Sequence, residues 1–259
     1  MKKVLITGAG SYIGTSFEKY LAQWPQEYQV DTLDMIDGTW REKSFAGYDS
    51  IFHVAGIAHI KETKENAHLY YEINRDLAVD TAKKAKADGV GQFIFLSTMA
   101  VYGIEEGTIS MTTVPKPKSN YGKAKLEAEQ ALDKMRSEKF TIAVLRPPMV
   151  YGDGCKGNYQ SLVKLAKKLP FFPDYKNKRS MLHIDKLCWY VKELIDNQID
   201  GLVLPQDEVY VCTCQMVYNI AKAMGRDMKL LKILNPAVSL FKLCTVKGKK
   251  AFGDLYYEK

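Results

Sequence analysis

Tyr121 and Lys125 lie four residues apart in a segment with a helical pattern, and such a pair can transfer protons. Residues at this spacing lie one turn apart on the same face of a helix. A tyrosine with its ordinary pKa of about 10 is a poor base near neutral pH. A neighbouring ammonium group stabilises the phenolate, so we expect Lys125 to lower the pKa of Tyr121 and let it exchange a proton with a substrate hydroxyl.

A segment with two hydroxyl side chains lies upstream of Tyr121 and Lys125 and supports a catalytic role for them. Tyrosine and lysine occur four apart by chance in many helices, and the chain holds 16 tyrosines. The predicted strand Gln92 to Ser97, however, leads into Ser97-Thr98. Such a position is at the carboxyl edge of a sheet, where the sites of α/β proteins form. The order of these three features favours a catalytic site.

A glycine-rich turn near the N-terminus is typical of a dinucleotide site. The apolar strand Lys3 to Thr7 leads through Gly8, Gly10 and Gly14 into a helical pattern. Glycines permit a tight turn and a close backbone approach, so that the amide groups at the helix N-terminus meet a pyrophosphate. Asp34 ends the second predicted strand, about 20 residues after Gly14, where a carboxylate accepts hydrogen bonds from the adenosine ribose.

Asp34 also bears on the choice of cofactor. A carboxylate there repels a 2′-phosphate, and the following Met35-Ile36 offers no arginine to bind one. The sequence therefore favours NAD(H) over NADP(H). The alternative is that Asp34 is an ordinary residue of a strand-end turn.

Apolar strands alternate with helices over the first part of the chain, which predicts an α/β protein with a Rossmann-type, doubly wound parallel sheet. The predicted strands are Lys3 to Thr7, Gln29 to Asp34, Ser50 to Val54, Gln92 to Ser97 and Thr141 to Arg146, and the predicted helices are Tyr12 to Trp24, Leu69 to Asp88 and Tyr121 to Ser137.

Beyond Arg146 the pattern becomes irregular and rich in proline, with helices expected around Ser161 to Lys168, Asp185 to Asn197 and Gln215 to Met224. We therefore expect an NAD-binding domain over residues 1–151, to which 184–204 return with a strand at Leu202 to Leu204. Residues 152–259 should mainly form a small C-terminal substrate-binding lobe that supplies one side of a cleft.

Composition narrows the class of protein. The chain has 259 residues, 46% of them hydrophobic, enough for a sizeable core. No apolar run is long enough to span a bilayer and no signal region is seen at Met1, so we expect a cytoplasmic protein without a membrane partner. The net charge of +7 comes from lysines spread along the chain, without a dense basic block, which argues against nucleic acid and suits a diphosphate substrate. Five sparsely spaced cysteines predict buried thiols and no metal site.

Taken together, the motifs resemble those of the extended short-chain dehydrogenase/reductase family, and in particular of its nucleotide-sugar epimerase and dehydratase branch. The resemblance runs from Lys3 to about Leu187. It is carried by Thr7 to Gly14, His53 to Gly56, Asn74, Ser97-Thr98 before Val101 to Gly103, Tyr121 with Lys125, Leu145 to Pro148 before Val150 to Gly152, and His183 to Asp185.

The resemblance implies a role for each matching residue. Tyr121 would be the acid/base, Lys125 would tune it and hold the nicotinamide ribose, and Thr98 would bind the reacting oxygen. Asn158 and Arg179 would contact the substrate diphosphate, with helix capping and a surface charge as their alternatives. The residues expected to line NAD are Gly8, Gly10, Ser11, Tyr12, Ile13, Gly14, Asp34, Val54, Ala55, Gly56, Asn74, Ser97, Lys125 and Pro147.

Two departures from the family pattern narrow the expected activity. Ser11 stands where the family has the middle glycine of its turn, and Met99-Ala100 replaces the Asp-Glu pair of the sugar 4,6-dehydratases, which argues against dehydration. The resemblance then implies an NAD-dependent epimerase of a nucleotide-diphosphate sugar, acting at C4 through a 4-keto intermediate. The alternatives are an NAD(P)H-dependent reductase of a 4-keto nucleotide sugar and a dinucleotide-binding regulatory protein without catalysis.

The resemblance alone implies two further properties. One is a role in polysaccharide synthesis, and the other is a homodimer formed through Leu69 to Asp88 and Tyr121 to Ser137.

Overall fold

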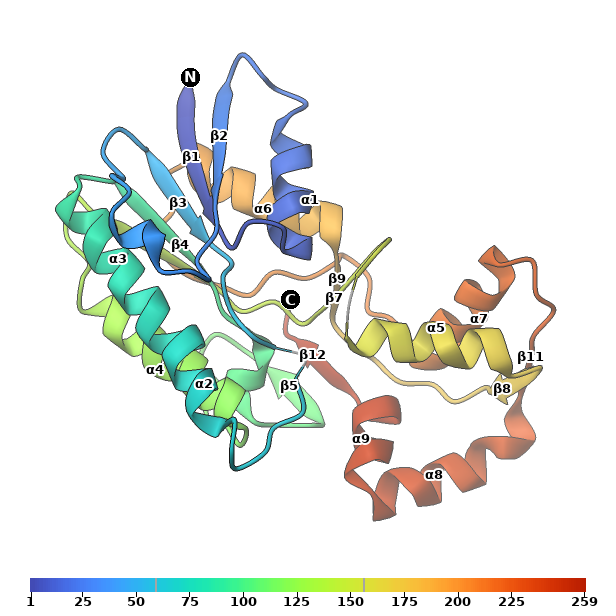
Figure 1. The fold of residues 1–259 in the computed structure, drawn as a ribbon. Helices are drawn as coiled ribbons and strands as arrows, with labels where there is room; N and C mark the ends of the chain where they lie inside the picture. The colour runs from blue at the N-terminus through green and yellow to red at the C-terminus, as the bar shows by residue number, and fades with distance from the viewer. Residues whose placement is uncertain (59, 156) are drawn as a thin grey trace. The chain divides into compact units, whose positions relative to one another are not determined.

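The computed structural model describes residues 1–58, 60–155 and 157–259 and divides into two compact units (Figure 1). Unit 1 comprises Met1–Gly103, Pro115–Pro147 and Ile184–Pro205, and unit 2 comprises Ile104–Val114, Pro148–His183 and Gln206–Lys259. This division differs from the expected one over residues 104–114 and 148–151. Both stretches belong to unit 2 because their strands pair there, β5 (Gly107–Ile109) with β12 (Leu255–Tyr257) and β7 (Met149–Tyr151) with β9 (Met181–His183).

Unit 1 is built on a parallel sheet of six strands in the order β10-β6-β4-β3-β1-β2. The strands are β1 (Lys2–Thr7), β2 (Tyr28–Leu33), β3 (Ser50–His53), β4 (Gln92–Leu96), β6 (Thr141–Leu145) and β10 (Gly201–Val203). The chain leaves β1 for β2 at the edge and then crosses back to β3 on the other side of β1. Ligands of open α/β sheets bind at such a switch point, beside the carboxyl ends of the strands.

Helices cover both faces of this sheet, which explains why its central strands are buried and mostly apolar. One face carries α1 (Tyr12–Leu21) and α6 (Ile184–Asp196), and the other carries α3 (Leu77–Ala87) and α4 (Asn120–Asp133) (Figure 1). Every residue of β3 and β4 is buried. The predicted Rossmann-type, doubly wound fold is confirmed.

The helix predicted from Leu69 to Asp88 is interrupted. It consists of α2 (Ala67–Tyr71), a single π-helical turn (Glu72–Asp76) and α3. A π turn inserts one extra residue per turn and is frequent at functional sites. Here it places the side chain of Asn74 in the interior, against the end of β3.

Unit 2 has several two-stranded pairs and four helices within the described residues. Besides β5, β7, β9 and β12 it holds β8 (Phe171–Pro173), β11 (Lys229–Leu231), α5 (Asn158–Lys168), α7 (Thr213–Ala223), α8 (Asn235–Cys244) and α9 (Val246–Phe252). Its core includes Ala166 of α5, Val217 of α7, Val238 of α8 and Phe252 of α9. In the described parts of the chain, no helix has the length and apolar character needed to cross a membrane.

Candidate active site

The glycine turn forms a cradle at the carboxyl end of β1. Gly8 and Gly10 have φ values of 87° and 73°, in the left-handed region that favours glycine. A Cβ on Gly8 would lie 3.0 Å from backbone atoms of Ala55, so this glycine lets the ends of β1 and β3 approach closely. The exposed backbone of this turn fits the pyrophosphate of a dinucleotide.

Ser11, the departure from the family pattern, serves as the N-cap of α1. Its hydroxyl accepts a hydrogen bond of 3.1 Å from the amide of Gly14. A Cβ on Gly14 would lie 2.8 Å from that hydroxyl oxygen, so the serine and the glycine depend on each other. Tyr12 and Ile13 follow in the first turn of α1, where the amide groups favour an anion.

The loop after β3 is held by the buried side chain of Asn74. The Oδ1 atom of Asn74 accepts from the amide of Ile57 at 3.0 Å, and its Nδ2 atom donates to the carbonyl of Ile57 at 3.0 Å. A Cβ on Gly56 would lie 2.6 Å from Oδ1 and 3.5 Å from the Nζ atom of Lys125. Asn74 therefore fixes the backbone at Ile57, next to Gly56 and Lys125, and its direct contact with the cofactor stays a prediction.

Asp34 follows the last residue of β2 and is exposed. Its Oδ1 atom accepts a hydrogen bond of 2.9 Å from the amide of Ile36. The amides of Gly8 and Ala9 donate to the carbonyl of Leu33, at 2.9 and 3.1 Å, so the carboxylate borders the glycine turn. This placement suits the ribose contact predicted for it.

Replacing Asp34 by serine should raise the Kd for NAD roughly ten- to hundredfold, because hydrogen bonds to a charged group contribute about 1.5–3 kcal/mol. The Kd for NADP should fall, since the repulsion of its 2′-phosphate is removed. Isothermal titration calorimetry measures both values. Asp37→Ser is the matched control, because Asp37 is an exposed carboxylate in the following loop that binds only Thr39 in the hydrogen bonds described. Unchanged NAD affinity in Asp34→Ser would contradict the assignment.

Tyr121 and Thr98 meet where α4 begins. Ser119 caps the helix by accepting from the amide of Gly122 at 3.1 Å. A Cβ on Gly122 would lie 2.8 Å from the carbonyl oxygen of Ala100, so this glycine lets α4 lie against the short helix Met99–Tyr102. Thr98 caps that short helix, and its side chain lies close enough to the Tyr121 hydroxyl to lower the pKa of that tyrosine. Thr98 is thus placed to bind the oxygen with which Tyr121 exchanges a proton.

An acidic residue supports the same helix end and was missed by sequence reasoning. The two carboxylate oxygens of Glu62 accept from the amides of Asn120 and Tyr121, each at 3.1 Å. A carboxylate at a helix N-terminus is favoured by the helix dipole. An open hollow of about 440 Å³ lies here, lined by Glu62, Thr63, Lys64, Ala67 and Asn120.

Lys125 is buried next to Tyr121, but its ammonium is engaged elsewhere. Its Nζ atom donates to the carbonyl of Leu96 at 2.8 Å and lies 4.5 Å from the centre of the Phe95 ring. Burial lowers the pKa of Lys125 to about 7, and the nearby carboxylate of Glu129 opposes this shift. His53 is also buried near Lys125, and burial together with the lysine's charge lowers its pKa to about 3.

The pKa of Tyr121 departs from the sequence-based expectation. Burial raises it to about 12, against a smaller lowering by the Thr98 hydroxyl. The expected lowering by Lys125 is not seen, because the Nζ atom of Lys125 donates to the carbonyl of Leu96, and because a pKa of about 7 leaves Lys125 only about half charged at pH 7. In the protein without cofactor Tyr121 is therefore a protonated phenol, ready to donate.

The depressed pKa of Lys125 predicts a pH dependence of stability. Between the folded value of about 7 and the ordinary value of 10.5, the unfolded chain binds one proton more than the folded chain. The free energy of unfolding should therefore rise with pH across this window, by up to about 1.4 kcal/mol per unit, and this contribution is lost as pH falls towards 7. Urea unfolding of the cofactor-free protein and of Lys125→Met, from pH 7 to 9, measures the difference. If the difference in unfolding free energy between the two proteins did not change with pH, Lys125 would keep its ordinary pKa.

A buried ion pair lies behind the catalytic residues and was also missed. The guanidinium of Arg146 donates to both carboxylate oxygens of Glu129, with the closest distance 2.5 Å, and to the Tyr102 hydroxyl at 2.9 Å. Ser97 donates its hydroxyl to the same carboxylate. Because this hydroxyl is engaged, the contact of Ser97 with the cofactor stays a prediction. Glu129 lies one helical turn after Lys125, a spacing that could have drawn attention to this carboxylate but not to its pairing with Arg146.

The remaining predicted residues lie in well-defined places. The carbonyl of Pro147 accepts from the amide of Met99 at 2.9 Å, which ties the end of β6 to the segment after Thr98. In unit 2, Asn158 is the exposed first residue of α5. The Nη1 atom of Arg179 donates to the carbonyl of Gly253 at 3.1 Å, and burial lowers the pKa of this guanidinium. The contacts of Asn158 and Arg179 with a substrate diphosphate stay predictions.

No metal centre is found among the described residues, where no group of three or more His, Cys, Asp or Glu side chains is suitably placed. Five cysteines are free, and Cys155, Cys188 and Cys214 are buried.

A doubly wound sheet with a glycine turn, an exposed carboxylate just after β2 and a Thr-Tyr-Lys set defines an NAD-binding enzyme of the short-chain dehydrogenase type. Residues 4–201 match the model of the NAD-dependent epimerase/dehydratase family, and the chain belongs to this family. The predicted family membership and NAD as cofactor are confirmed.

Named relatives place the chain more closely. It is 30% identical over 253 residues to a UDP-glucose 4-epimerase of Vibrio cholerae, covering 87% of this chain and 76% of the relative. It is 25% identical over 274 residues to an N-acetyl-alpha-D-glucosaminyl-diphospho-ditrans,octacis-undecaprenol 4-epimerase of Escherichia coli O157:H7, covering 95% and 81%. A UDP-glucuronic acid 4-epimerase of Bacillus cereus, solved with NAD, has the same fold, with a TM-score of 0.75, 19% identity and coverage of 99% and 89%.

Proposed function

We propose that this protein is an NAD-dependent 4-epimerase of a nucleotide-diphosphate sugar. The observation that carries the proposal is that Tyr121 lies close to the Thr98 side chain, which lowers its pKa, and one helical turn from the buried Lys125. The 4-epimerases among the relatives support it. Met99-Ala100 follows Thr98 and offers no acid-base pair for the elimination of water.

The residues present fit the dinucleotide. The left-handed Gly8 and Gly10 leave the backbone open for the pyrophosphate, and Asp34 stands ready for the ribose. NAD, when bound, accepts hydride from the reacting carbon and returns it. Its positive nicotinamide ring also adds the charge that would bring the pKa of Tyr121 down from about 12.

In the proposed reaction Tyr121 takes the proton of the sugar's 4-hydroxyl as the carbon becomes a ketone. Thr98 holds the reacting oxygen while its bonding changes. Lys125 would hold the nicotinamide ribose of bound NAD and, in its charged form, would stabilise the phenolate. After the 4-keto sugar has presented its other face, Tyr121 gives the proton back, so that neither protons nor electrons are consumed in a turnover.

A reductase of a 4-keto nucleotide sugar would use the same residues and is the second candidate. It would consume one reduced cofactor in each turnover, whereas the epimerase consumes none. A further alternative is a substrate whose sugar diphosphate is attached to a polyprenol and not to a nucleoside. The E. coli relative is named for a polyprenol-linked sugar, whereas the V. cholerae relative is named for a nucleotide sugar. A cytoplasmic setting and a role in polysaccharide synthesis stay part of this proposal.

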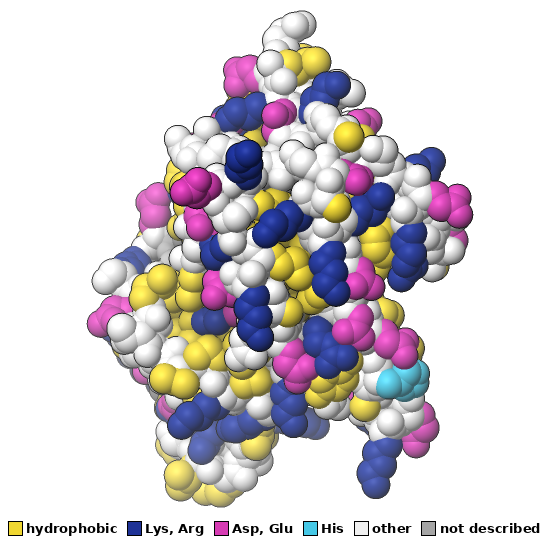
Figure 2. All heavy atoms as spheres, turned by 90° about the vertical axis from the view of Figure 1, so that its left-hand side faces the viewer, with side chains coloured by type: hydrophobic (Ala, Val, Ile, Leu, Met, Phe, Trp, Pro, Cys, Tyr) yellow, Lys and Arg dark blue, Asp and Glu magenta, His cyan; other side chains and the backbone are white. Residues whose placement is uncertain are grey.

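We also propose a homodimer formed through α3 and α4. Lysine and arginine side chains alternate with acidic ones on the face that carries these helices, and apolar side chains lie between them (Figure 2). Such a mixture of opposite charges is compatible with a self-complementary interface. Light scattering of the eluting protein gives the mass, and a monomer at micromolar concentration would contradict the dimer.

The proposed activity is tested by incubating the protein with NAD⁺ and a panel of UDP-, dTDP- and GDP-sugars in heavy water, followed by NMR of the anomeric protons. A new sugar without deuterium in its ring is expected. Deuterium entering the ring or C6 would indicate an enolising reaction and would exclude simple 4-epimerisation. Conversion of 4-keto substrates with NADH alone would favour the reductase.

A further inference from the structure

The last part of unit 2 concentrates positive charge. From Met228 to Gly253 the sequence holds six lysines and neither aspartate nor glutamate, whereas the net charge of the whole chain is +7. The basic residues are therefore less evenly spread than we expected from the sequence. Lys242 pairs with Glu106 at 2.5 Å and Lys250 with Glu105 at 3.4 Å. Lys229, Lys232, Lys247 and Lys249 are exposed and enter no salt bridge among the residues that the structure describes.

Large apolar side chains are exposed on the same segment. Ile233 is 85% exposed, Leu240 63%, Leu243 76% and Val246 61%. Leu240 and Leu243 lie three residues apart on α8, Ile233 lies in the short helix Lys232–Leu234 just before α8, and Val246 begins α9 after the extended residue Thr245. We call these four exposed side chains on consecutive elements the apolar stripe. Single exposed apolar residues are ordinary on a protein surface, but a contiguous stripe indicates an interaction site.

The opposite face of α8 and α9 anchors the pair to the core of unit 2. Val238 and Phe252 are buried there, and the rings of Phe241 and Phe252 lie 6.4 Å apart. A Cβ on Gly248 would lie 2.3 Å from the carbonyl oxygen of Phe241, so this glycine lets α9 pack directly on the end of α8. Asn235 donates to the carbonyl of Asp174 at 3.0 Å. The exposed stripe is therefore held in place and is not a loose end of the chain.

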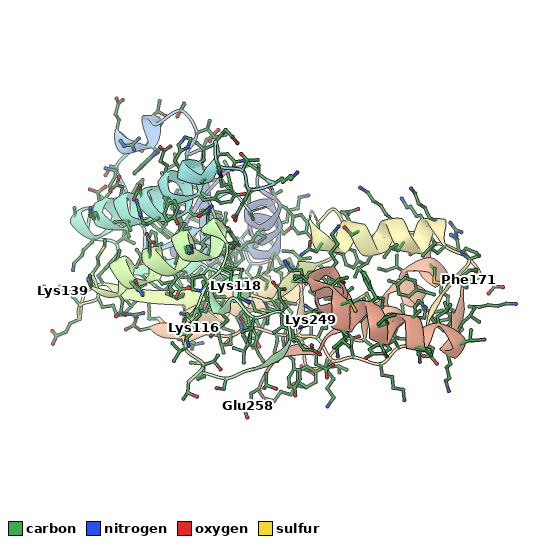
Figure 3. All side chains as sticks on the ribbon, turned by 90° about the horizontal axis from the view of Figure 1, so that it is seen from below. Lys116, Lys118, Lys139, Phe171, Lys249 and Glu258 are labelled. Carbon is green, nitrogen blue, oxygen red and sulfur yellow. The ribbon has the colours of Figure 1, made fainter. Side chains whose placement is uncertain are left out.

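We propose that the α8–α9 face, formed by Ile233, Leu240, Leu243, Val246 and the surrounding lysines, docks on the surface of an anionic phospholipid bilayer. An amphipathic helix with lysines beside its apolar stripe lies in the membrane interface, where the apolar side chains enter the acyl boundary and the lysines meet lipid phosphates. Figure 3 views the molecule from the side of these helices and labels Lys249 on α9 and the half-exposed Phe171 of β8. Phe171 pairs in register with Lys229, so the apolar and basic character extends to β8.

The charge pattern selects this partner over others. A second copy of the same face would bring lysines against lysines, and a nucleic acid would gain nothing from exposed leucine and isoleucine side chains. The proposal replaces the expectation of a protein without a membrane partner, and it concerns peripheral binding only. It does not depend on the proposed function, since binding to vesicles needs no substrate.

Sedimentation of the full-length protein with vesicles tests the proposal. Vesicles of phosphatidylglycerol and phosphatidylcholine should bind the protein, pure phosphatidylcholine should bind it at least tenfold more weakly, and 0.5 M salt should release it. Leu240→Glu/Leu243→Glu should weaken binding at least tenfold, and Lys247→Gln/Lys249→Gln roughly twentyfold, because each lysine near an anionic surface contributes about a fivefold factor. Val114→Glu/Val209→Glu is the matched control, with the same charge change at two other exposed valines of unit 2.

Three outcomes would overturn the proposal. The first is that the wild-type protein does not bind anionic vesicles. The second is that the lysine changes abolish binding while the leucine changes do not, which would show attraction by charge alone. The third is that the leucine changes convert a dimer into a monomer while the wild type ignores vesicles, which would make the face an interface between copies. Equal unfolding temperatures and equal activity on a soluble substrate exclude misfolding of the variants.

Discussion

Replacing Tyr121 by phenylalanine should lower kcat about a thousandfold while leaving the fold and cofactor binding intact. The change removes one hydroxyl, whose described partner is the side chain of Thr98. Proton transfer by a positioned side chain typically contributes a factor of about 10²–10⁴. Because the ring remains, its edge contact with Tyr70, at 6.5 Å between ring centres, should be kept. The NAD Kd and the unfolding temperature should therefore match those of the wild type.

Tyr71→Phe is the matched control for this change. Tyr71 also lies beside the start of α4, where its hydroxyl donates to Oδ1 of Asn120 at 3.3 Å. It is not expected to meet the reacting oxygen, so its kcat should stay within about threefold of the wild-type value, since a lost surface hydrogen bond contributes about 1 kcal/mol or less. A Tyr121→Phe enzyme that retains a tenth or more of the wild-type kcat would contradict the assignment of the acid/base.

The second large effect is expected on stability, from Arg146→Met. This change removes the guanidinium that pairs with Glu129 and leaves a carboxylate buried with only the Ser97 hydroxyl to bind it. Removing one partner of a buried ion pair costs about 3–5 kcal/mol. The double variant Glu129→Leu/Arg146→Met should recover most of this loss, because no unpaired charge remains. Urea unfolding at pH 7 measures all three proteins.

An exposed pair provides the comparison. Arg75 pairs with Asp76 and Glu127, each at 2.7 Å, with side chains that are one third to one half exposed. Exposed pairs contribute about 0–1 kcal/mol, so Arg75→Met should lower the unfolding free energy by no more than about 1 kcal/mol. If Arg146→Met lowered the unfolding free energy by no more than Arg75→Met does, the buried pair would not contribute to stability.

Local patterns predicted the part of the molecule that binds the dinucleotide. The strand-turn-helix from Lys3 to Leu21, the carboxylate at Asp34 and the tyrosine-lysine pair are each defined by residues close in sequence. The central strands are uniform apolar runs because helices cover both faces of the sheet. Predicted ends differed by one to four residues, as for the helix Tyr12–Leu21, which was expected to continue to Trp24.

Features that depend on distant residues were not predictable in this way. The strands of unit 2 are three residues long and form only because a partner from another part of the chain pairs with them, as β5 does with β12. The π turn that buries Asn74 leaves no mark in the hydrophobic pattern of the helix. The pKa of Lys125 depends on how deeply it is buried and on its bond to Leu96, neither of which is visible in its spacing from Tyr121.

The most direct measurement of the central claim uses a nucleotide sugar with deuterium at C4 of the ring. The protein is given this substrate with a catalytic amount of NAD⁺ in ordinary water, and the product is examined by NMR. If Tyr121, Thr98 and Lys125 support oxidation and return of hydride at C4, the epimerised product keeps its deuterium at C4 and no reduced cofactor is consumed. Product that has lost the deuterium, or turnover only with stoichiometric NADH, would contradict the account.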